Sequence, residues 1–433
     1  MDALARIGFG LFGLAVLIGI TWLFSNNRHK VNWKLVGTGL LLQIALACFV
    51  LLTPWGASAF DAISKGFVTL LGFTTEGAKV VFGDFTRPDK FGFVFAFQVL
   101  PTIIFFASFM SVLYHLGLIQ RVVQAMAWGI TKLMPVSGAE TLSVCANAFV
   151  GQTEAPLVIK PYIARMTQSE LLTLMLGGMA TIAGGVLAAY VTMLGGDDPA
   201  QQAFYAKHLL TASIMAAPAT LVISKIMMPE TQIPDTLGKV DVKVEKTSSN
   251  LIDAAAAGAS DGLKLALNVG AMLLAFTALI AMLNAPLIWL GQVTGLEAAL
   301  GQPTSMANLL GKLLAPLAWV IGVPWQDASA VGSLIGTKVV INEFIAYDQL
   351  TRMDAGQVAG VAPLSTEAKL IATYALCGFA NFSSIAIQIG GIGALAPERR
   401  QDLARLGLKA VLGGTLATMM TATIAGVLHA IGA

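Results

Sequence analysis

The sequence predicts an all-α polytopic membrane protein, with about eight transmembrane helices and two re-entrant hairpins that enter from opposite faces. Of the 433 residues, 56% are hydrophobic and only 12% are charged, whereas a soluble domain has about 25% charged residues. Eight stretches contain no Asp, Glu, Lys or Arg, and each supplies the roughly 20 apolar residues that a spanning helix needs, the fifth only with its flanks from 203 to 228. These stretches are 7–27, 35–60, 91–120, 171–196, 209–224, 265–296, 370–397 and 410–433.

The charge balance excludes one class of partner. The net charge is +2, and no basic patch indicates nucleic acid as a partner. The first apolar stretch lacks a basic leader and a small-residue cleavage site, so we expect a retained helix rather than a signal peptide.

Basic residues in the short loops predict the orientation of the chain. Segment 28–34 holds three basic residues and no acidic one, so it should be cytoplasmic, with the N-terminus outside. The mostly basic segment 398–409 should also lie inside, which places the C-terminus outside. Segment 54–90 has balanced charge and suits the outer side, with an interfacial helix expected near 60–71, and 229–262 should be the longest cytoplasmic connection.

Two apolar stretches are too interrupted to be simple crossings. The first, 142–159, is cut by Gly151 and Pro156, both of which break regular helix. The second, 316–347, is interrupted by Pro324, Gly332 and Gly336. Since the two enter from different sides in the expected orientation, they predict inverted re-entrant hairpins.

An internal repeat supports this arrangement. When the chain is shifted by 200 residues, similar residues coincide in two apolar helices, each of which follows a hairpin that bears a glutamate. The matched pairs are Leu171–Ile371, Thr173–Thr373, Leu176–Leu376, Gly178–Gly378, Ala180–Ala380 and Thr181–Asn381. Chance similarity between two helices rich in small residues is the alternative. Inverted repeats with interrupted helices are typical of secondary transporters.

The two hairpin glutamates are the first candidate functional residues. Glu154 and Glu343 both lie among apolar residues, where a carboxylate is costly unless it is paired, hydrated or used. A structural role is the alternative, with backbone groups or the lysines Lys160 and Lys338 as partners.

The repeated helices carry the remaining polar candidates. Segment 177–185 has four glycines and one threonine, which indicates either close helix packing or a local unwinding that frees carbonyls for a cation. Segment 377–384 places polar side chains in the membrane, where they either hold helices together or bind a polyhydroxylated ligand together with Glu343. These side chains are Asn381, Ser383 and Ser384.

Three motifs together resemble the concentrative nucleoside transporter family. They are Gly151-Gln-Thr-Glu-Ala-Pro156, Asn342-Glu343-Phe344 and Cys377-Gly-Phe-Ala-Asn-Phe-Ser-Ser384. The resemblance covers essentially the whole chain and is closest to the shorter bacterial members.

The resemblance implies a nucleoside site built from both hairpins and both repeated helices. Residues of the first hairpin would contact the nucleobase, Glu343 would bind the ribose hydroxyls together with an asparagine and a serine, and two apolar residues would flank the ligand. The implied set is Gly151, Gln152, Thr153, Glu154, Val186, Glu343, Phe379, Asn381 and Ser384.

The resemblance also implies sodium as the coupling ion. Asn147, Thr181 and the backbone carbonyls of Val150 and Ile182 would hold it between the first hairpin tip and the unwound helix. Some family members have serine where Thr181 stands, and a hydroxyl is retained in either case.

The resemblance further implies a homotrimer in the bacterial inner membrane, in which each protomer has a scaffold part and a mobile transport part. The expected divisions are 1–116 for the N-terminal scaffold helices, 117–228 for the first hairpin with two transport helices, 229–315 for the linker and a scaffold helix, and 316–433 for the second hairpin with two transport helices. The expected function is sodium-coupled import of uridine and other pyrimidine nucleosides, with adenosine as a further substrate.

Two other functions stay open at this point. One is a proton-coupled transporter of nucleosides or of another small polar solute. The other is an intramembrane enzyme, which the sequence disfavours because it has no histidine–carboxylate metal motif and no paired catalytic aspartates.

Overall fold

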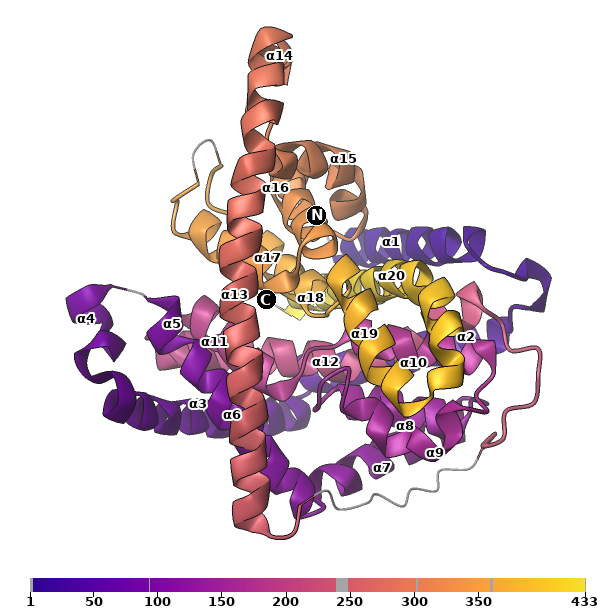
Figure 1. The fold of residues 1–433 in the computed structure, drawn as a ribbon. Coiled ribbons are helices and arrows are strands. Elements are labelled where there is room, and N and C mark those ends of the chain that lie inside the picture. Colours follow the sequence, from indigo (N-terminus) through magenta and orange to yellow (C-terminus); the bar gives the residue numbers. More distant parts are fainter. Residues whose placement is uncertain (1–2, 93, 239–247, 301–302, 359–360, 433) are drawn as a thin grey trace.

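The protein folds almost entirely into helices (Figure 1). The computed structural model describes residues 3–92, 94–238, 248–300, 303–358 and 361–432. Within these ranges the only β-type pairing is an isolated bridge between Ser137 and Leu237. The all-α fold class is therefore confirmed.

The helices follow one another along the whole described chain. In order they are α1 (Ala3–Leu23), η1 (Arg28–Lys30), α2 (Trp33–Leu52), α3 (Pro54–Phe82), η2 (Gly83–Thr86), α4 (Pro88–Phe91), α5 (Phe95–Gln98), α6 (Leu100–His115), α7 (Leu118–Leu133), α8 (Gly138–Asn147), η3 (Ala155–Ile159), α9 (Lys160–Ile163), α10 (Gln168–Ala180), α11 (Gly184–Gly195), α12 (Pro199–Met227), α13 (Leu251–Val293), α14 (Leu296–Leu300), α15 (Met306–Val320), α16 (Trp325–Val340), α17 (Glu343–Asp354), α18 (Thr366–Leu376), α19 (Phe382–Leu395), η4 (Pro397–Arg399) and α20 (Arg400–Gly432).

Seven helical stretches of the described chain are long and apolar enough to cross a membrane. They correspond to seven of the eight expected spans. The eighth, 370–397, is divided into α18 and α19. The bent pair α15–α16 also passes the test when it is taken as one unit.

The apolar helices divide into a buried group and a peripheral group. In the most apolar part of each, 89% of the residues are buried for Gln168–Gly195 and Pro199–Met227, and 83% for Pro397–Gly432. The same fraction is only 11% for α13, which runs as one long rod across the front of the molecule in Figure 1. The core therefore lies around α10, α11, α12 and α20.

Both repeated helices are interrupted, as one of the two interpretations of segment 177–185 predicted. The first stops at Ala180 and resumes at Gly184, and the second stops at Leu376 and resumes at Phe382. Thr181 and Asn381, which the repeat pairs with each other, both lie in these breaks. Each break leaves the last carbonyls of one half-helix and the first amides of the next without partners in their own helix.

The second hairpin region is interrupted at Pro324, as predicted, but not at Gly332 or Gly336. The chain bends by 116° between α15 and α16 and breaks again between Val340 and Glu343. Gly332 lies inside α16 instead, where a Cβ atom would come within 2.7 Å of the Gly311 carbonyl oxygen of α15. The glycine therefore allows two helices to pack closely, and the entry of this hairpin from the outer face stays a prediction.

Several helices are longer than expected. The expected interfacial helix near 60–71 is part of the continuous helix α3. The expected cytoplasmic connection 229–262 ends early, because α13 begins at Leu251, where the Asn250 side chain accepts from the Asp253 amide and an alanine-rich run follows. Residues 239–247 of that connection lie outside the described residues. The helix α7 had not been predicted.

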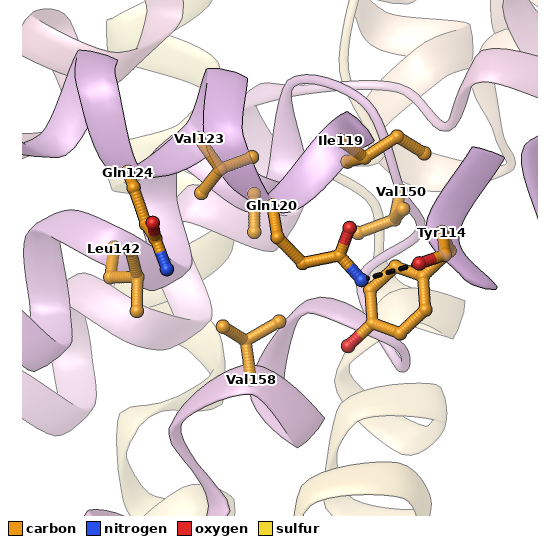
Figure 2. A pocket seen from close by; sticks show the side chains of 9 residues that line it. Tyr114, Ile119, Gln120, Val123, Gln124, Leu142, Val150 and Val158 are labelled. Atoms are coloured by element: carbon orange, nitrogen blue, oxygen red, sulfur yellow. Dashed lines mark hydrogen bonds between the residues drawn. The ribbon is translucent and has the colours of Figure 1, made fainter. Parts of the chain in front are cut away.

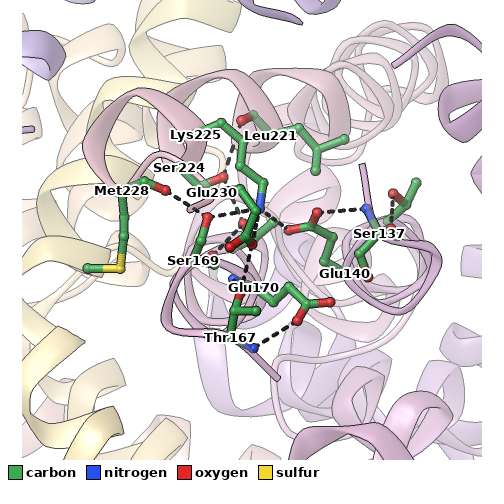
Figure 3. A network of polar contacts seen from close by, with 12 residues as sticks. Ser137, Glu140, Thr167, Ser169, Glu170, Leu221, Ser224, Lys225, Met228 and Glu230 are labelled. Atoms are coloured by element: carbon green, nitrogen blue, oxygen red, sulfur yellow. Dashed lines mark hydrogen bonds and ion pairs between the residues drawn. The ribbon is translucent and has the colours of Figure 1, made fainter. Parts of the chain in front are cut away.

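A buried ion pair ties the first hairpin to the core (Figure 3). Lys225 of α12 pairs with Glu140 of α8 at 2.7 Å, and both side chains are almost fully buried. The Lys225 ammonium also donates to Ser169 at 2.9 Å and lies 3.6 Å from Glu230. Glu140 in turn accepts from the Ser137 amide in a capping box, so the network joins α8, α10 and α12 at one end.

We predict that Lys225→Met destabilises the protein by about 3–5 kcal/mol, because removal of one partner leaves the Glu140 carboxylate buried without a cation. The measurement is the unfolding of the purified protein in detergent. Lys264→Met is the control, since its pair with Asp261 lies on the exposed surface, and should change stability by no more than about 0.5 kcal/mol. Equal stability of the two variants would contradict the prediction.

Candidate functional site

Glu343 is fixed at the start of a half-helix in the core. Asn342 caps α17, since its side chain accepts from the Ile345 amide at 2.9 Å. Glu343 is therefore the first residue of the helix, where the helix dipole favours a negative charge. Its carboxylate is buried and accepts from the Tyr190 hydroxyl at 2.9 Å and from the Asn381 amide at 3.0 Å.

Asn381 links this carboxylate to the second broken helix. It caps α19, with its side-chain oxygen accepting from the Ser384 amide at 2.8 Å and from the Ser383 hydroxyl at 2.7 Å. Its NH2 group is thereby directed to Glu343. The Asn381 side chain therefore has two roles. Its oxygen caps α19, and its NH2 group donates to the Glu343 carboxylate.

The first hairpin joins the same cluster through Gln152. The Gln152 amide donates to the Ser384 hydroxyl at 3.3 Å, and its oxygen accepts from Gln388 at 3.1 Å. Gln388 also donates to the Met175 carbonyl of α10 at 2.9 Å. One polar cluster therefore runs from Tyr190 through Glu343, Asn381 and Ser384 to the first hairpin.

The two breaks touch each other directly. The Phe379 amide donates to the Thr181 carbonyl at 3.3 Å. At Gly378 a Cβ atom would come within 2.7 Å of the Met179 carbonyl oxygen, so only glycine permits this approach of two backbones. Phe379 itself is half-buried beside this contact.

The four expected sodium ligands lie on the two segments that face each other across the first break. The Gly184 amide donates to the Phe149 carbonyl at 3.1 Å, which brings the hairpin tip with Val150 to the break with Thr181 and Ile182. The Thr181 hydroxyl donates to the Gly177 carbonyl at 2.9 Å, which leaves its lone pairs free to accept.

Asn147 presents an unused oxygen in this region. Its NH2 group donates to the Ser143 carbonyl at 3.0 Å, while its buried side-chain oxygen has no partner among the described residues. A buried polar atom without a partner needs an explanation, such as a bound ion or an ordered water. Hard cations prefer oxygen ligands, so the residues present fit a bound Na⁺.

The other residues of the expected nucleoside site have fewer contacts. The Glu154 side chain is exposed, folds back over Gly151, and makes no hydrogen bond or ion pair with a described residue. Thr153 packs on Gly391, where a Cβ atom would come within 2.8 Å. Val186 is buried in α11 one turn before Tyr190, and so lies on the helix face that carries the donor to Glu343.

The lysines are not the partners of the two glutamates. Lys160 is exposed, and Lys338 donates to the Ala375 carbonyl and the Thr418 hydroxyl instead. Glu343 is satisfied by neutral donors from α11 and from the second break. The structure therefore does not support the alternative in which Lys160 and Lys338 are the ion-pair partners of these two glutamates.

Two residues of this cluster had not been predicted. Gln388 follows Asn381 by seven residues and Ser384 by four, a spacing that places all three on one helix face. That polar stripe in an apolar helix was a usable signal. Tyr190 had no such signal, because a single tyrosine in an apolar span is equally compatible with packing alone.

A small cavity lies between α7 and the first hairpin, and it is not the polar site (Figure 2). Gln120 reaches into it and donates to the Tyr114 carbonyl at 2.6 Å. Most of the lining is apolar, and it includes none of the residues that surround Glu343. The lining residues are Tyr114, Ile119, Gln120, Val123, Gln124, Leu142, Ala146, Val150 and Val158.

Two broken helices that cross at a buried polar cluster, within a set of apolar spans, define a membrane transporter. Three family models match the chain: the N-terminal part of Na⁺-dependent nucleoside transporters at 12–85, a nucleoside-recognition gate domain at 96–197, and the C-terminal part of Na⁺-dependent nucleoside transporters at 208–426. The chain belongs to the concentrative nucleoside transporter family. Its membership also confirms that it is a transporter rather than an enzyme.

Similar proteins cover the chain from end to end. An uncharacterized transporter of Haemophilus influenzae is 44% identical over 98% of both chains. The nucleoside permease NupC of Helicobacter pylori is 40% identical, over 96% of this chain and 97% of the permease. The mouse sodium/nucleoside cotransporter 1 is also 40% identical, and the match spans 63% of that longer protein.

Solved structures share the whole fold. CNTnw in an inward-facing, substrate-bound state matches with a TM-score of 0.87 at 43% identity, over 99% of both chains. CNTnw in an intermediate state matches with a TM-score of 0.90 at 42% identity, over the full length of both.

We predict that Tyr190→Phe weakens binding of a labelled nucleoside such as uridine by roughly tenfold or more, because a hydrogen bond to a charged group is worth about 1.5–3 kcal/mol. Equilibrium binding to the purified protein measures this. Tyr347→Phe is the matched control: this buried tyrosine packs on Tyr190, but its hydroxyl donates to the Thr373 carbonyl. It should lower stability while the nucleoside dissociation constant is retained.

Proposed function

We propose that this protein is a sodium-coupled symporter that imports nucleosides, uridine and other pyrimidine nucleosides first and adenosine in addition, by alternating access. The observation that carries the proposal is the buried pair of Glu343 and Asn381. It joins the start of one half-helix to the break of another, at 3.0 Å. Such a junction offers both a strong acceptor and an amide donor to vicinal hydroxyls.

Ribose recognition follows from the chemistry of this pair. A buried carboxylate accepts strongly from hydroxyl groups, because charge-assisted hydrogen bonds are stronger in a water-poor site. A site built for hydroxyls rejects an analogue that lacks them, since its own polar groups are then left unpaired. Glu343, Asn381 and Ser384 would therefore distinguish a nucleoside from a free base.

Recognition of the nucleobase is assigned to the first hairpin. Gln152 reaches the Ser384 hydroxyl, so the ribose and base subsites would adjoin. Thr153 and the exposed carboxylate of Glu154 follow on the same turn. Val186 and Phe379 would flank the ligand with apolar surface.

Sodium coupling rests on the unused oxygen of Asn147. The ion would be held by Asn147, Thr181 and the carbonyls of Val150 and Ile182, and it would also offset the negative charge of Glu154. Because the Thr181 carbonyl accepts from the Phe379 amide of the other break, an ion at the first break would order the second. Sodium and nucleoside would then favour the same state, and this coupling is reciprocal.

The buried and peripheral helix groups support a division into transport and scaffold parts. Residues 117–228 and 316–433 would form the transport part, and residues 1–116 and 229–315 the scaffold. The long helix α13 exposes large apolar side chains such as Leu267, Leu274 and Met282, which lipid or neighbouring subunits of a homotrimer would cover. The protein would lie in the bacterial inner membrane with both termini on the periplasmic side.

Uptake of labelled uridine into proteoliposomes, with and without a sodium gradient, tests this function. We expect uptake against the uridine gradient only when sodium is present. Uptake driven by a proton gradient alone would favour proton coupling, and transport of another polar solute without uridine competition would remove the nucleoside assignment.

We predict that Glu343→Gln and Asn381→Ala each weaken uridine binding by roughly ten- to hundredfold, the equivalent of about 1.5–3 kcal/mol, while the protein stays folded. Both remove a charge-assisted bond to the ribose. Binding and size-exclusion measurements on the purified variants check this, with Glu76→Gln on the exposed face of α3 as the control. Parent-like uridine binding in either variant would remove that residue from the site.

We predict that Asn147→Ala and Thr181→Ala raise the sodium concentration needed for half-maximal uptake. Each removes an oxygen ligand of a hard cation. Nucleoside affinity should recover at least in part at high sodium, because the coupling is reciprocal. Thr192→Ala is the control, since that hydroxyl only donates to the Ala188 carbonyl of its own helix. An unchanged sodium dependence in both variants would refute the assigned ion site.

A further inference from the structure

Lys338 is a buried cation for which the proposed transport function has no role. It lies in the last turn of α16, its side chain is 0% exposed, and it makes no ion pair with any residue the structure describes. An ammonium group in such a place is costly unless its three donors are satisfied. The hydrogen-bond partners of the Lys338 ammonium group therefore indicate its role.

The Lys338 ammonium lies at the carbonyl end of a half-helix. It donates to the Ala375 carbonyl at 2.8 Å and to the Thr418 hydroxyl of α20 at 3.0 Å. Ala375 is in the last turn of α18, whose final carbonyls have no partner within the helix and carry partial negative charge. Thr418 directs its own proton to the Thr415 carbonyl at 2.9 Å, so its oxygen is free to accept.

A polar side chain also lies at the end of a half-helix in the first repeat. There the last residue of α8, Asn147, lies against the last turn of α10, since a Cβ on Gly177 would be 3.3 Å from the Asn147 side-chain nitrogen. Its oxygen lacks a partner, and a mobile ion is the proposed ligand. In the second repeat, α16 brings an ammonium group to Ala375 in the last turn of α18, a residue that the repeat pairs with Met175 and not with the proposed sodium ligands Thr181 and Ile182.

We propose that Lys338 is a tethered cation that orders the second helix break. Its effect on nucleoside binding rests on the proposed function. The ammonium holds the end of α18 against α16 and α20, and so positions Glu343 five residues further on and Asn381 beyond the same break. Lys338 is a positioning residue and does not touch the nucleoside.

Chemical rescue distinguishes a cation from a space-filling side chain. Lys338→Ala removes three carbons and the nitrogen, which n-propylammonium supplies, whereas 1-propanol supplies the same length without charge. We expect Lys338→Ala to weaken uridine binding by roughly tenfold or more and to lower the thermal unfolding midpoint. n-Propylammonium should restore both in part, and 1-propanol neither.

Lys264→Ala is the matched control, because its lysine is exposed on α13 and pairs only with Asp261. Neither this variant nor the parent should respond to the amine. Parent-like uridine binding and stability in Lys338→Ala, equal rescue by 1-propanol, or no rescue by the amine would each overturn the proposal.

Should Lys338→Ala not fold, Thr418→Val removes one acceptor of the ammonium with little change in shape. It should weaken uridine binding severalfold, whereas Thr423→Val should not, since Thr423 in the same helix only donates back to Met419. Equal behaviour of the two variants would overturn the proposal.

A parent protein that binds no nucleoside would instead refute the proposed function. The effect of n-propylammonium on the unfolding midpoint of Lys338→Ala would still test the role of Lys338.

Discussion

The structure depends on the contact between two interrupted helices in its core. Backbone groups freed by a helix break cannot remain unpaired at membrane depth, so a break survives only where other protein groups or a wet cavity receive it. Here the first break provides an acceptor for a backbone amide that the second break has freed. The Phe379 amide is satisfied by the Thr181 carbonyl, and Gly378 allows the backbones to meet.

Each buried charge near this contact is held by a different set of partners. Glu343 is surrounded by neutral donors from Tyr190 and Asn381, whereas Lys338 lies at backbone and hydroxyl oxygens. Among the residues that the structure describes, only Lys225 and Glu140, at the end of the core, form an ion pair in which both side chains are buried. In the proposed nucleoside site, neutral donors would let the Glu343 carboxylate exchange protein partners for ligand hydroxyls, which a tight lysine pair would prevent.

The first hairpin is also linked, far from this contact, to the loop that follows the second broken helix. Arg399, just before α20, donates to the carbonyls of Ile163 and Met166 at 3.2 and 2.6 Å, where the first hairpin leaves the core. The carbonyl end of α9 is thus held by the loop that follows the second broken helix. Buried links of this kind hold the parts of the core together, whereas few residues of α13 are buried.

Much of this organisation could be predicted from the sequence because it depends on local composition. Charge-free stretches predicted the spans, the glycines and polar residues of 177–185 and 377–384 indicated both breaks, and the three motifs identified the family and the acids. The sequence could not place α7 or the break between Val340 and Glu343, and it could not separate Pro324, which lies at a break, from Gly332, because proline and glycine fit both a break and a close helix contact. Gly332 turned out to serve packing.

Tertiary structure alone decided which polar groups pair. That Tyr190 rather than a lysine would reach Glu343, and that Lys338 would bind a helix end 37 residues away, depends on how the halves of the repeat pack, which no local pattern encodes. The unused oxygen of Asn147 likewise becomes visible only when its neighbours are known. Local chemistry determined which residues are costly to bury, and packing determined how each cost is offset.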